Sequence, residues 1–250
     1  MSIKIKTDRE IALIRESCRL AAKILQAAGK LVAPGITTDQ INTFVHEETI
    51  KAGAYPSPLN YHGFPKSVCT SVNHVVCHGI PSQQILKEGD IVNIDVTCLL
   101  QGYHGDTSKT FLVGKADKEA QRLVDAAQRC LEEGIAVATP GNFFGAIGDS
   151  IQALADELGY GVVREYCGHG IGRNFHEDPM VLHYRSGSRG ARISEGMVFT
   201  IEPMINIGSR DVCVADDGWT VYTKDGSLSA QFEHTLAITR HGPEILTQLD

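Results

Sequence analysis

Apolar side chains recur at helical spacing in four stretches of the chain. In the first stretch they include Ile11, Ile14 and Ile24, and a proline–glycine pair at 34–35 follows it. Apolar residues three and four positions apart share one face of a helix, and a Pro-Gly pair stops a helix. We therefore expect helices over residues 7–30, from Thr37 to near Gly53, over about 117–138 and over about 144–158.

Runs rich in valine and isoleucine occupy much of the remaining chain and are typical of strands. They predict strands at about 67–78, 91–98, 103–113, 160–166, 197–207, 219–223 and 230–238. No linker or low-complexity tract interrupts this order, so we expect residues 1–250 to form a single α/β domain.

The two halves of the chain resemble each other. The pair Pro34-Gly35 recurs at 140–141, and each pair precedes a predicted helix. The segment Glu88–Asp95 is similar to Glu195–Glu202 at an offset of 107, since each contains Glu-Gly, an apolar strand and a final carboxylate. Two matches at nearly equal offset indicate an internal duplication of a helix–helix–strand unit. A pseudo-two-fold axis would bring Asp95 and Glu202 towards the middle.

Four carboxylates occupy strands, where acidic residues are depleted. If the turn at 99–102 is centred between residues 100 and 101, facing residues have numbers that add up to 201, and Asp95 faces Asp106. The hairpin signal at 217–218 predicts pairs that add up to 435, so that Glu202 faces Glu233. Like charges placed directly opposite each other destabilise a sheet. One such carboxylate fits an edge strand facing water, but two opposed pairs fit that explanation poorly.

Converging carboxylates need a positive counter-charge, because their repulsion raises their pKa values. Two divalent metal ions balance four carboxylates in charge. His169 lies between two glycines, where a ligand can approach closely, and it adds a nitrogen donor. Thr97 and Thr200 lie two residues from Asp95 and Glu202 on the same strand faces, and we expect them to hydrogen-bond to the metal ligands.

Composition narrows the classes of function. The 250 residues include 23 Lys and Arg against 30 Asp and Glu, and the formal charge of −7 argues against DNA as a partner. No apolar run approaches the ~18 residues of a membrane span, so no membrane partner is expected. Seven cysteines without a C-x-x-C pair predict reduced thiols, and the charged N-terminus does not resemble a secretory signal, so we expect a cytoplasmic protein.

In order and local motif, the five candidate ligands resemble the metal ligands of the methionine aminopeptidases of type I, in their bacterial form. The likeness covers essentially the whole chain and includes Asn60–His62, Pro65–Cys69, Val76–Pro81, Gly168–Gly172, Thr200–Pro203, Asp217–Thr220 and Ala230–Thr235. It implies the "pita-bread" fold, a curved antiparallel sheet backed by two pairs of helices with a pseudo-two-fold internal repeat.

The resemblance also implies an activity, the removal of an N-terminal methionine from nascent proteins and peptides when the second residue is small. Its metal ligands are Asp95, Asp106, His169, Glu202 and Glu233, which hold two divalent ions of Co, Mn, Fe(II), Zn or Ni. Asp106 and Glu233 bridge both ions, Asp95 completes one shell, and His169 with Glu202 completes the other. Glu202 also acts as general base.

By the same resemblance, His78 contacts the scissile amide nitrogen and His176 stabilises the tetrahedral oxyanion. The methionine pocket consists of Tyr61, Phe64, Cys69, Phe175 and Trp219. Aromatic rings favour contacts with a thioether sulfur. This sequence has Pro58 where some relatives have Cys, and Phe64 where some have Tyr. Asn73, Val75 and Ser229 match a monovalent-cation site.

The implied partners are nascent polypeptide N-termini, with transient docking on the ribosome, and the chain is expected to act as a monomer. The chain's own Met1-Ser2 has a small second residue and is itself an expected substrate. Two alternatives remain open at this point. One is a related dimetal peptidase, similar to prolidase or aminopeptidase P, and the other is a metal-free peptide-binding module of the same fold.

Overall fold

The computed structural model describes residues 3–249, so the expected substrate end Met1-Ser2 lies outside the described residues. Its α-helices are α1 (Asp8–Gly29), α2 (Thr38–Lys51), α3 (Lys118–Val137) and α4 (Phe144–Leu158), with a 3-10 helix η1 at Tyr61–Gly63. The four predicted helices are therefore confirmed to within two residues at each end. Within the described range no helix is long and apolar enough to cross a membrane.

Side-chain caps explain where three of the helices begin. The Thr7 hydroxyl accepts the backbone N–H of Glu10, and the Glu10 carboxylate accepts the backbone N–H of Thr7. Thr37 and Gln40 make the same reciprocal pair at α2. Asp117 accepts from the first turn of α3. Each cap satisfies amides that have no partner inside the helix.

The strands form a large sheet of eleven strands and a small sheet of three in the part of the chain that the structure describes. They are β1 (Tyr55–Pro56), β2 (Cys69–Val72), β3 (Val75–Cys77), β4 (Ile91–Leu100), β5 (Tyr103–Leu112), β6 (Gly161–Val162), β7 (Gly168–Gly170), β8 (Glu177–Val181), β9 (Val198–Ile201), β10 (Met204–Asn206), β11 (Val212–Val214), β12 (Val221–Thr223), β13 (Ser229–Thr239) and β14 (Gly242–Ile245). The large sheet runs β1-β4-β5-β13-β9-β7-β8, and the small one runs β11-β12-β3. Neighbouring strands are antiparallel.

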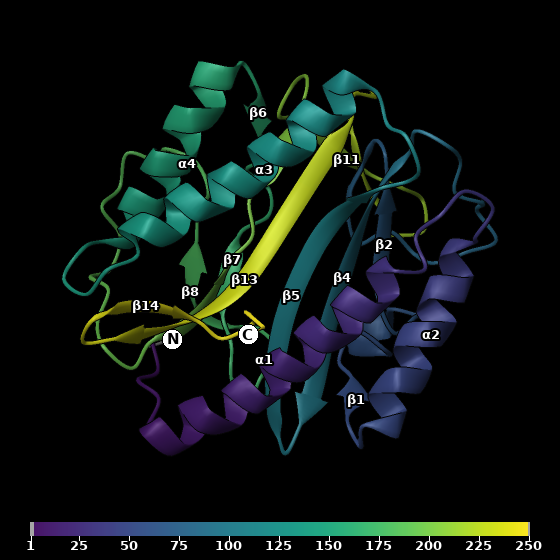
Figure 1. The fold of residues 1–250 in the computed structure, drawn as a ribbon. Helices are drawn as coiled ribbons and strands as arrows, with labels where there is room; N and C mark the ends of the chain where they lie inside the picture. Colours follow the sequence, from purple (N-terminus) through teal and green to yellow (C-terminus); the bar gives the residue numbers. More distant parts are fainter. Residues whose placement is uncertain (1–2, 250) are drawn as a thin grey trace.

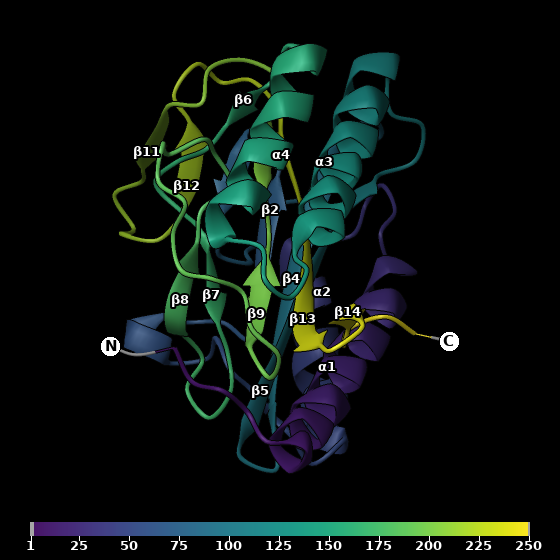
Figure 2. The same cartoon turned by 90° about the vertical axis from the view of Figure 1, so that its left-hand side faces the viewer.

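The helices cover one face of the large sheet, as the two views in Figure 1 and Figure 2 show. α1 packs on β4 and β5, and α3 packs on β13. Two buried clusters lie between these layers, one around Ile41 and Ile94, the other around Leu131 and Phe199. Since β5 pairs with β13 at the centre, each half contributes two helices and a set of antiparallel strands to the large sheet, as the internal repeat predicts.

The β4–β5 hairpin corrects one sequence-based expectation. Paired residues have numbers that add up to 203 rather than 201, so Asp106 faces Thr97 and Asp95 faces Ser108. The prediction that Asp95 and Asp106 lie directly opposite each other is wrong. Gln101 and Gly102 both adopt positive φ, 51° and 80°, and form the turn one residue later than expected. The two carboxylates remain diagonal neighbours on one sheet face.

The register predicted for the second hairpin is confirmed. Pairs on both sides of Glu202 add up to 435, with Ile201 opposite His234 and Met204 opposite Gln231. The same sum holds near the tip, where Val214 pairs with Val221. One hairpin register therefore runs from residue 197 to residue 238 and passes from the large sheet into the small one.

Several predicted strands are shorter than expected. The predicted strand 67–78 is broken at Asn73, whose φ is +55°, and its two parts join different sheets. The strand predicted at 197–207 is interrupted at Glu202 and Pro203, because proline has no N–H to donate. Only Gly161–Val162 remains of the strand predicted at 160–166. The short strands β1, β7, β8 and β14 were not predicted.

Candidate metal centre and substrate pocket

The five predicted ligands come from separate elements and meet at the middle of the large sheet. Asp95 lies on β4, Asp106 on β5, His169 on β7 and Glu233 on β13, while Glu202 directly follows β9. One ligand atom each from Asp106, His169 and Glu233 lies within 4.8 Å of the other two. His169 Nε2 is 3.6 Å from Asp106 Oδ2 and 3.7 Å from Glu202 Oε1. Such a group of oxygen and nitrogen donors can hold divalent cations.

Within the candidate donor set, Asp95 Oδ1 and Glu233 Oε1 are buried and have no hydrogen-bond partner. Burial and the neighbouring Asp106 raise the pKa values of Asp95 and Glu233 well above the usual range. Burial, together with repulsion from Asp106, raises the pKa of Glu202 to about 7. The attraction of His169 lowers this pKa but offsets the rise only in part. A buried unpaired carboxylate is costly in the absence of a cation. The donor set therefore fits divalent metal ions.

The His169 ring is held with Nε2 towards the carboxylates of Asp106 and Glu202. Nδ1 lies 3.0 Å from the carbonyl oxygen of Gly170, to which it donates, so Nε2 faces the carboxylates unprotonated when the ring is neutral. Burial opposes the charged ring, but Asp106 and Glu202 outweigh it and raise the pKa of His169.

The two threonines predicted to support the ligands do so. The Thr200 hydroxyl donates to Glu202 Oε1 at 2.8 Å and accepts the backbone N–H of His169 at 3.0 Å. Thr97 donates to Asp106 Oδ1 at 2.7 Å, across the strand pair rather than along its own strand to Asp95. Each hydroxyl fixes the orientation of a carboxylate.

The glycines around His169 leave room for close neighbours. A Cβ atom at Gly168 would lie 2.4 Å from the carbonyl oxygen of Thr200, and one at Gly170 would lie 2.1 Å from that of Asp178. At Gly172 the added atom would lie 2.5 Å from Nζ of Lys6. The three glycines thus serve backbone contact and side-chain packing rather than phosphate binding.

Two supporting residues escaped the sequence analysis. The backbone N–H of Glu202 donates to Nε2 of His183 at 3.1 Å, and burial lowers the pKa of His183 to about 3, so this histidine is a neutral acceptor. Gln231 Nε2 donates to Glu202 Oε2 at 3.2 Å. Because His183 is 19 residues from Glu202 and Gln231 is 29 residues away, local spacing gave no signal for either.

A cavity of about 220 Å³ opens above Asp95, Asp106 and His169. All the predicted pocket and substrate-contacting residues line it: Tyr61, Phe64, Cys69, His78, Phe175, His176 and Trp219. Glu202 and Glu233 do not line it. Phe64 and Trp219 pack edge to face with ring centroids 5.2 Å apart, which gives the cavity an apolar end. Cys69 is buried there, and burial raises its thiol pKa well above the usual value.

His176 and His78 lie at the boundary between the apolar end and the carboxylates. The Tyr61 hydroxyl is 2.7 Å from Nδ1 of His176. Burial lowers the pKa of His176 to about 3, so the ring is neutral near pH 7. In the tautomer in which the Tyr61 hydroxyl donates to Nδ1, the ring proton resides on Nε2. His78 adopts a left-handed backbone conformation, φ +54°, which a non-glycine residue adopts only at a cost of ~1–3 kcal/mol.

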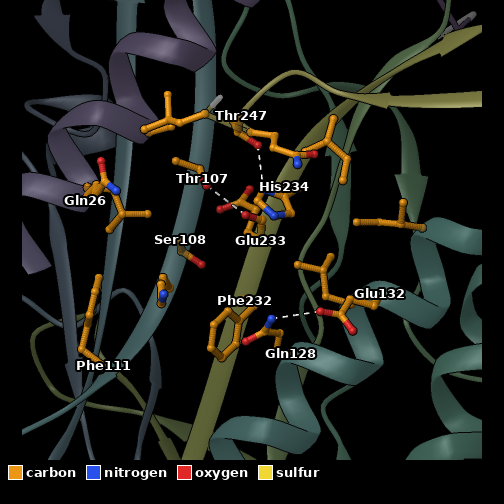
Figure 3. Close-up of a pocket in the computed structure, with 18 residues that line it drawn as sticks. Gln26, Thr107, Ser108, Phe111, Gln128, Glu132, Phe232, Glu233, His234 and Thr247 are labelled. Carbon is orange, nitrogen blue, oxygen red and sulfur yellow. Dashed lines mark hydrogen bonds between the residues drawn. The ribbon is translucent and has the colours of Figure 1, made fainter.

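A larger cavity of about 440 Å³ lies on the helix-covered face of the sheet, between α1 and α3 (Figure 3). Two pairs of its polar groups hydrogen-bond to each other: His234 Nδ1 with Thr247, and Gln128 with Glu132. Among the predicted metal ligands only Glu233 borders it. The smaller cavity is therefore the candidate active site.

The residues matched to a monovalent-cation site are also brought together. The backbone N–H of Ser229 donates to the carbonyl oxygen of Asn73 at 2.9 Å, and the Ser229 hydroxyl is buried without a partner. Val75 begins β3 two residues after Asn73. All seven cysteines are free thiols, as predicted.

Residues 12–240 match the model of metallopeptidase family M24. The chain is 49% identical over 247 residues to methionine aminopeptidase A of Synechocystis, with 98% of each chain covered. It also matches methionine aminopeptidases of Arabidopsis thaliana and Saccharomyces cerevisiae at 50–52% identity, spanning 62–70% of their length.

Solved structures support the same family assignment. The crystal structure of methionine aminopeptidase from Rickettsia prowazekii superposes with a TM-score of 0.97 at 48% identity, covering 99% of this chain and 100% of that one. Prolidase from Pyrococcus furiosus superposes with a TM-score of 0.77 at 25% identity, covering 98% of this chain and 66% of that one. These neighbours confirm the pita-bread fold with its antiparallel sheet and four helices.

Proposed function

The chain belongs to metallopeptidase family M24, among its methionine aminopeptidases, and on that premise we propose that it removes the N-terminal methionine from nascent proteins and peptides whose second residue is small. The observation that carries the proposal is the joining of two features in one cavity. Asp95, Asp106 and His169 lie at its base, and an aromatic, sulfur-compatible pocket closes its other end. The carboxylates serve hydrolysis and the pocket serves selection of methionine.

We propose that Asp95, Asp106, His169, Glu202 and Glu233 hold two divalent ions, with Asp106 and Glu233 shared between them. The unpartnered oxygens of Asp95 and Glu233 and the mutual proximity of the other donors support this assignment. Ions bound there supply a Lewis acid that polarises the scissile carbonyl and lowers the pKa of water. Cobalt, manganese, Fe(II), zinc and nickel all suit this donor set. Asn73, Val75 and Ser229 are the proposed site of a monovalent cation.

The protein side chains have separate roles in the proposed reaction. Glu202, oriented by Thr200 and Gln231, accepts the proton of the attacking water at its carboxylate. His176 donates a hydrogen bond from its Nε2–H to the oxygen that becomes negative in the transition state. The histidine suits this role because it is neutral and Tyr61 occupies its other nitrogen. His78 contacts the amide nitrogen of the scissile bond.

The pocket explains the preference for methionine. Tyr61, Phe64, Phe175 and Trp219 surround a cavity of about 220 Å³ with flat apolar faces. Aromatic faces and edges gain ~0.3–1.5 kcal/mol from a thioether sulfur at ~5 Å. We propose that residues 1–250 act as a single catalytic domain and a monomer on the N-termini of nascent chains, with transient ribosome docking.

A metal count and a peptide assay test this function together. Purified protein is loaded with Mn, Co or Fe(II), and its metal content is measured before the release of free methionine from Met-Ala-Ser is followed. Turnover of Met-Ala-Ser, with Met-Lys-Ser and Gly-Pro left intact, is expected. Cleavage of Gly-Pro alone favours the prolidase alternative. Protein that binds the tripeptide but holds no metal and releases nothing favours the metal-free binding module.

A further inference from the structure

The loop that carries Phe175 and His176 is anchored by a lysine far away in the sequence. Lys6 Nζ lies 2.5 Å from Glu177 Oε2, and Glu177 directly follows His176. The side chains of Lys6 and Glu177 are only 6% and 4% exposed, so this is a buried ion pair. Its partners are 171 residues apart, which makes it a tie between the N-terminal segment and the active-site loop.

The Glu177 carboxylate also closes the loop from within. Its Oε1 accepts the backbone N–H of Asn174 at 3.2 Å, and the carbonyl oxygen of Asn174 accepts the N–H of Gly172 at 3.2 Å. Burial on its own raises the pKa of Glu177, but hydrogen bonds from Lys6 and Asn174 outweigh it and lower the pKa. The carboxylate is therefore charged near pH 7, and Lys6 is the nearer and more deeply buried of the two lysines that contact it.

The surrounding backbone leaves space for this lysine. The Lys6 backbone N–H donates to the carbonyl oxygen of Gly196 at 2.7 Å, which fixes the N-terminal segment beside β9. Figure 2 shows this segment passing beneath β7, β8 and β9 before α1 begins. A Cβ atom at Gly196 would lie 2.6 Å from Ile5, and one at Gly172 would lie 2.5 Å from Lys6 Nζ. Glycines at both positions admit the segment and the ammonium group.

We propose that Lys6 is a positioning residue for catalysis, which holds His176 in place through the carboxylate of Glu177. The inference rests on the proposed function, because its effect is exerted on the oxyanion contact of His176. Loss of the ammonium removes the nearer, buried counter-charge of the Glu177 carboxylate and leaves only the longer contact with Lys4. The neighbouring Lys4 makes only a longer contact of 3.4 Å to the same carboxylate, and its side chain is 55% exposed. It therefore offers a matched control.

The test compares metal-loaded wild type, Lys6→Met and Lys4→Met on Met-Ala-Ser, with kcat and KM measured separately and folding checked by circular dichroism. A displacement of about 1 Å in a catalytic group costs up to ~10²-fold, so kcat of Lys6→Met should fall by about 10- to 100-fold with little change in KM. Lys4→Met should stay within about twofold of wild type because exposed pairs contribute little.

Two further measurements separate positioning from a general loss of stability. In a His176→Ala background, Lys6→Met should lower kcat by less than about twofold, because the group it positions is already gone. Gly172→Ala places a methyl group against the Lys6 ammonium and should displace it, so this variant should show the same loss in kcat. If Lys6→Met does not fold, the kcat of Gly172→Ala tests the positioning role of Lys6 instead.

Wild-type kcat in Lys6→Met, an equal loss in Lys4→Met, or an undiminished loss in the His176→Ala background would each overturn the proposal. Should Lys6→Met not fold, wild-type kcat in Gly172→Ala would overturn it. Failure of the wild type itself to release methionine would instead refute the proposed function, so the two failures are distinguishable.

Discussion

Removal of one carboxylate from the candidate metal centre should stabilise the metal-free protein while it destroys metal binding. Glu202 is the residue for this experiment, because burial raises its pKa from 4.5 to about 7. A carboxyl group with a raised pKa in the folded state binds a proton that the unfolded chain releases. Its contribution to stability is complete below about pH 4.5 and is lost as the pH rises through about 7.

The magnitude follows from the size of the shift. A change of one pKa unit corresponds to ~1.4 kcal/mol, so a rise from 4.5 to about 7 costs the metal-free folded state about 3 kcal/mol above pH 7. Glu202→Gln removes this cost and also relieves the repulsion on Asp106. In the presence of a chelator, the variant should therefore gain about 3 kcal/mol of unfolding free energy relative to wild type between pH 4.5 and 7.5.

The comparison with wild type is essential because buried histidines act in the opposite direction. Burial lowers the pKa values of His176 and His183 to about 3 and that of His234 to about 4. Folding keeps these rings neutral, so their contribution is present above pH 6.5 and is lost as the pH falls. Both proteins contain them, and the difference between the two stability curves removes their effect.

The assay is urea unfolding of both proteins in chelator at several pH values, followed by the same measurement with added Mn²⁺. Metal should stabilise wild type more at pH 7.5 than at pH 5.5, because protons compete with the cation for the carboxylates. Added Mn²⁺ should leave the unfolding free energy of Glu202→Gln nearly unchanged. A difference curve that is flat between pH 4.5 and 7.5, or that falls with rising pH, would refute the electrostatic reasoning.

Three substitutions test other parts of the site. Asp106→Asn should lower turnover of Met-Ala-Ser by far more than tenfold with circular dichroism unchanged, and retention of more than about a tenth of the rate, ~1.4 kcal/mol in barrier, would contradict the bridging role. His176→Ala should lower kcat by ~10²–10³-fold, whereas an effect on KM alone would contradict an oxyanion contact. Thr200→Val removes the hydroxyl that donates to Glu202 and accepts the backbone N–H of His169. A metal titration should then show affinity weakened by ~10–100-fold, and unchanged affinity would contradict the orienting role of Thr200.

The sequence predicts the helices well because their periodicity and caps are local. It also leads to the ligand set, since carboxylates in apolar strands are conspicuous without any long-range information. The register of β4 and β5 could not be fixed in this way, because it depends on Gln101, a residue seldom found at positive φ. His183, Gln231 and Lys6 had no local signal, since each acts on a residue distant in the chain and its role exists only after folding.

The unbroken register of the hairpin between residues 197 and 238 limits how this chain can change length during evolution. Glu202 and Glu233 lie at matching positions on its two arms, and Trp219 lies near its tip at the wall of the pocket. A single-residue insertion in one arm shifts the pairing and turns later side chains to the opposite face. Matched insertions in both arms keep the two carboxylates opposed and move only the tip. Variation of the pocket wall can therefore accumulate by paired changes, while the carboxylates keep their alignment.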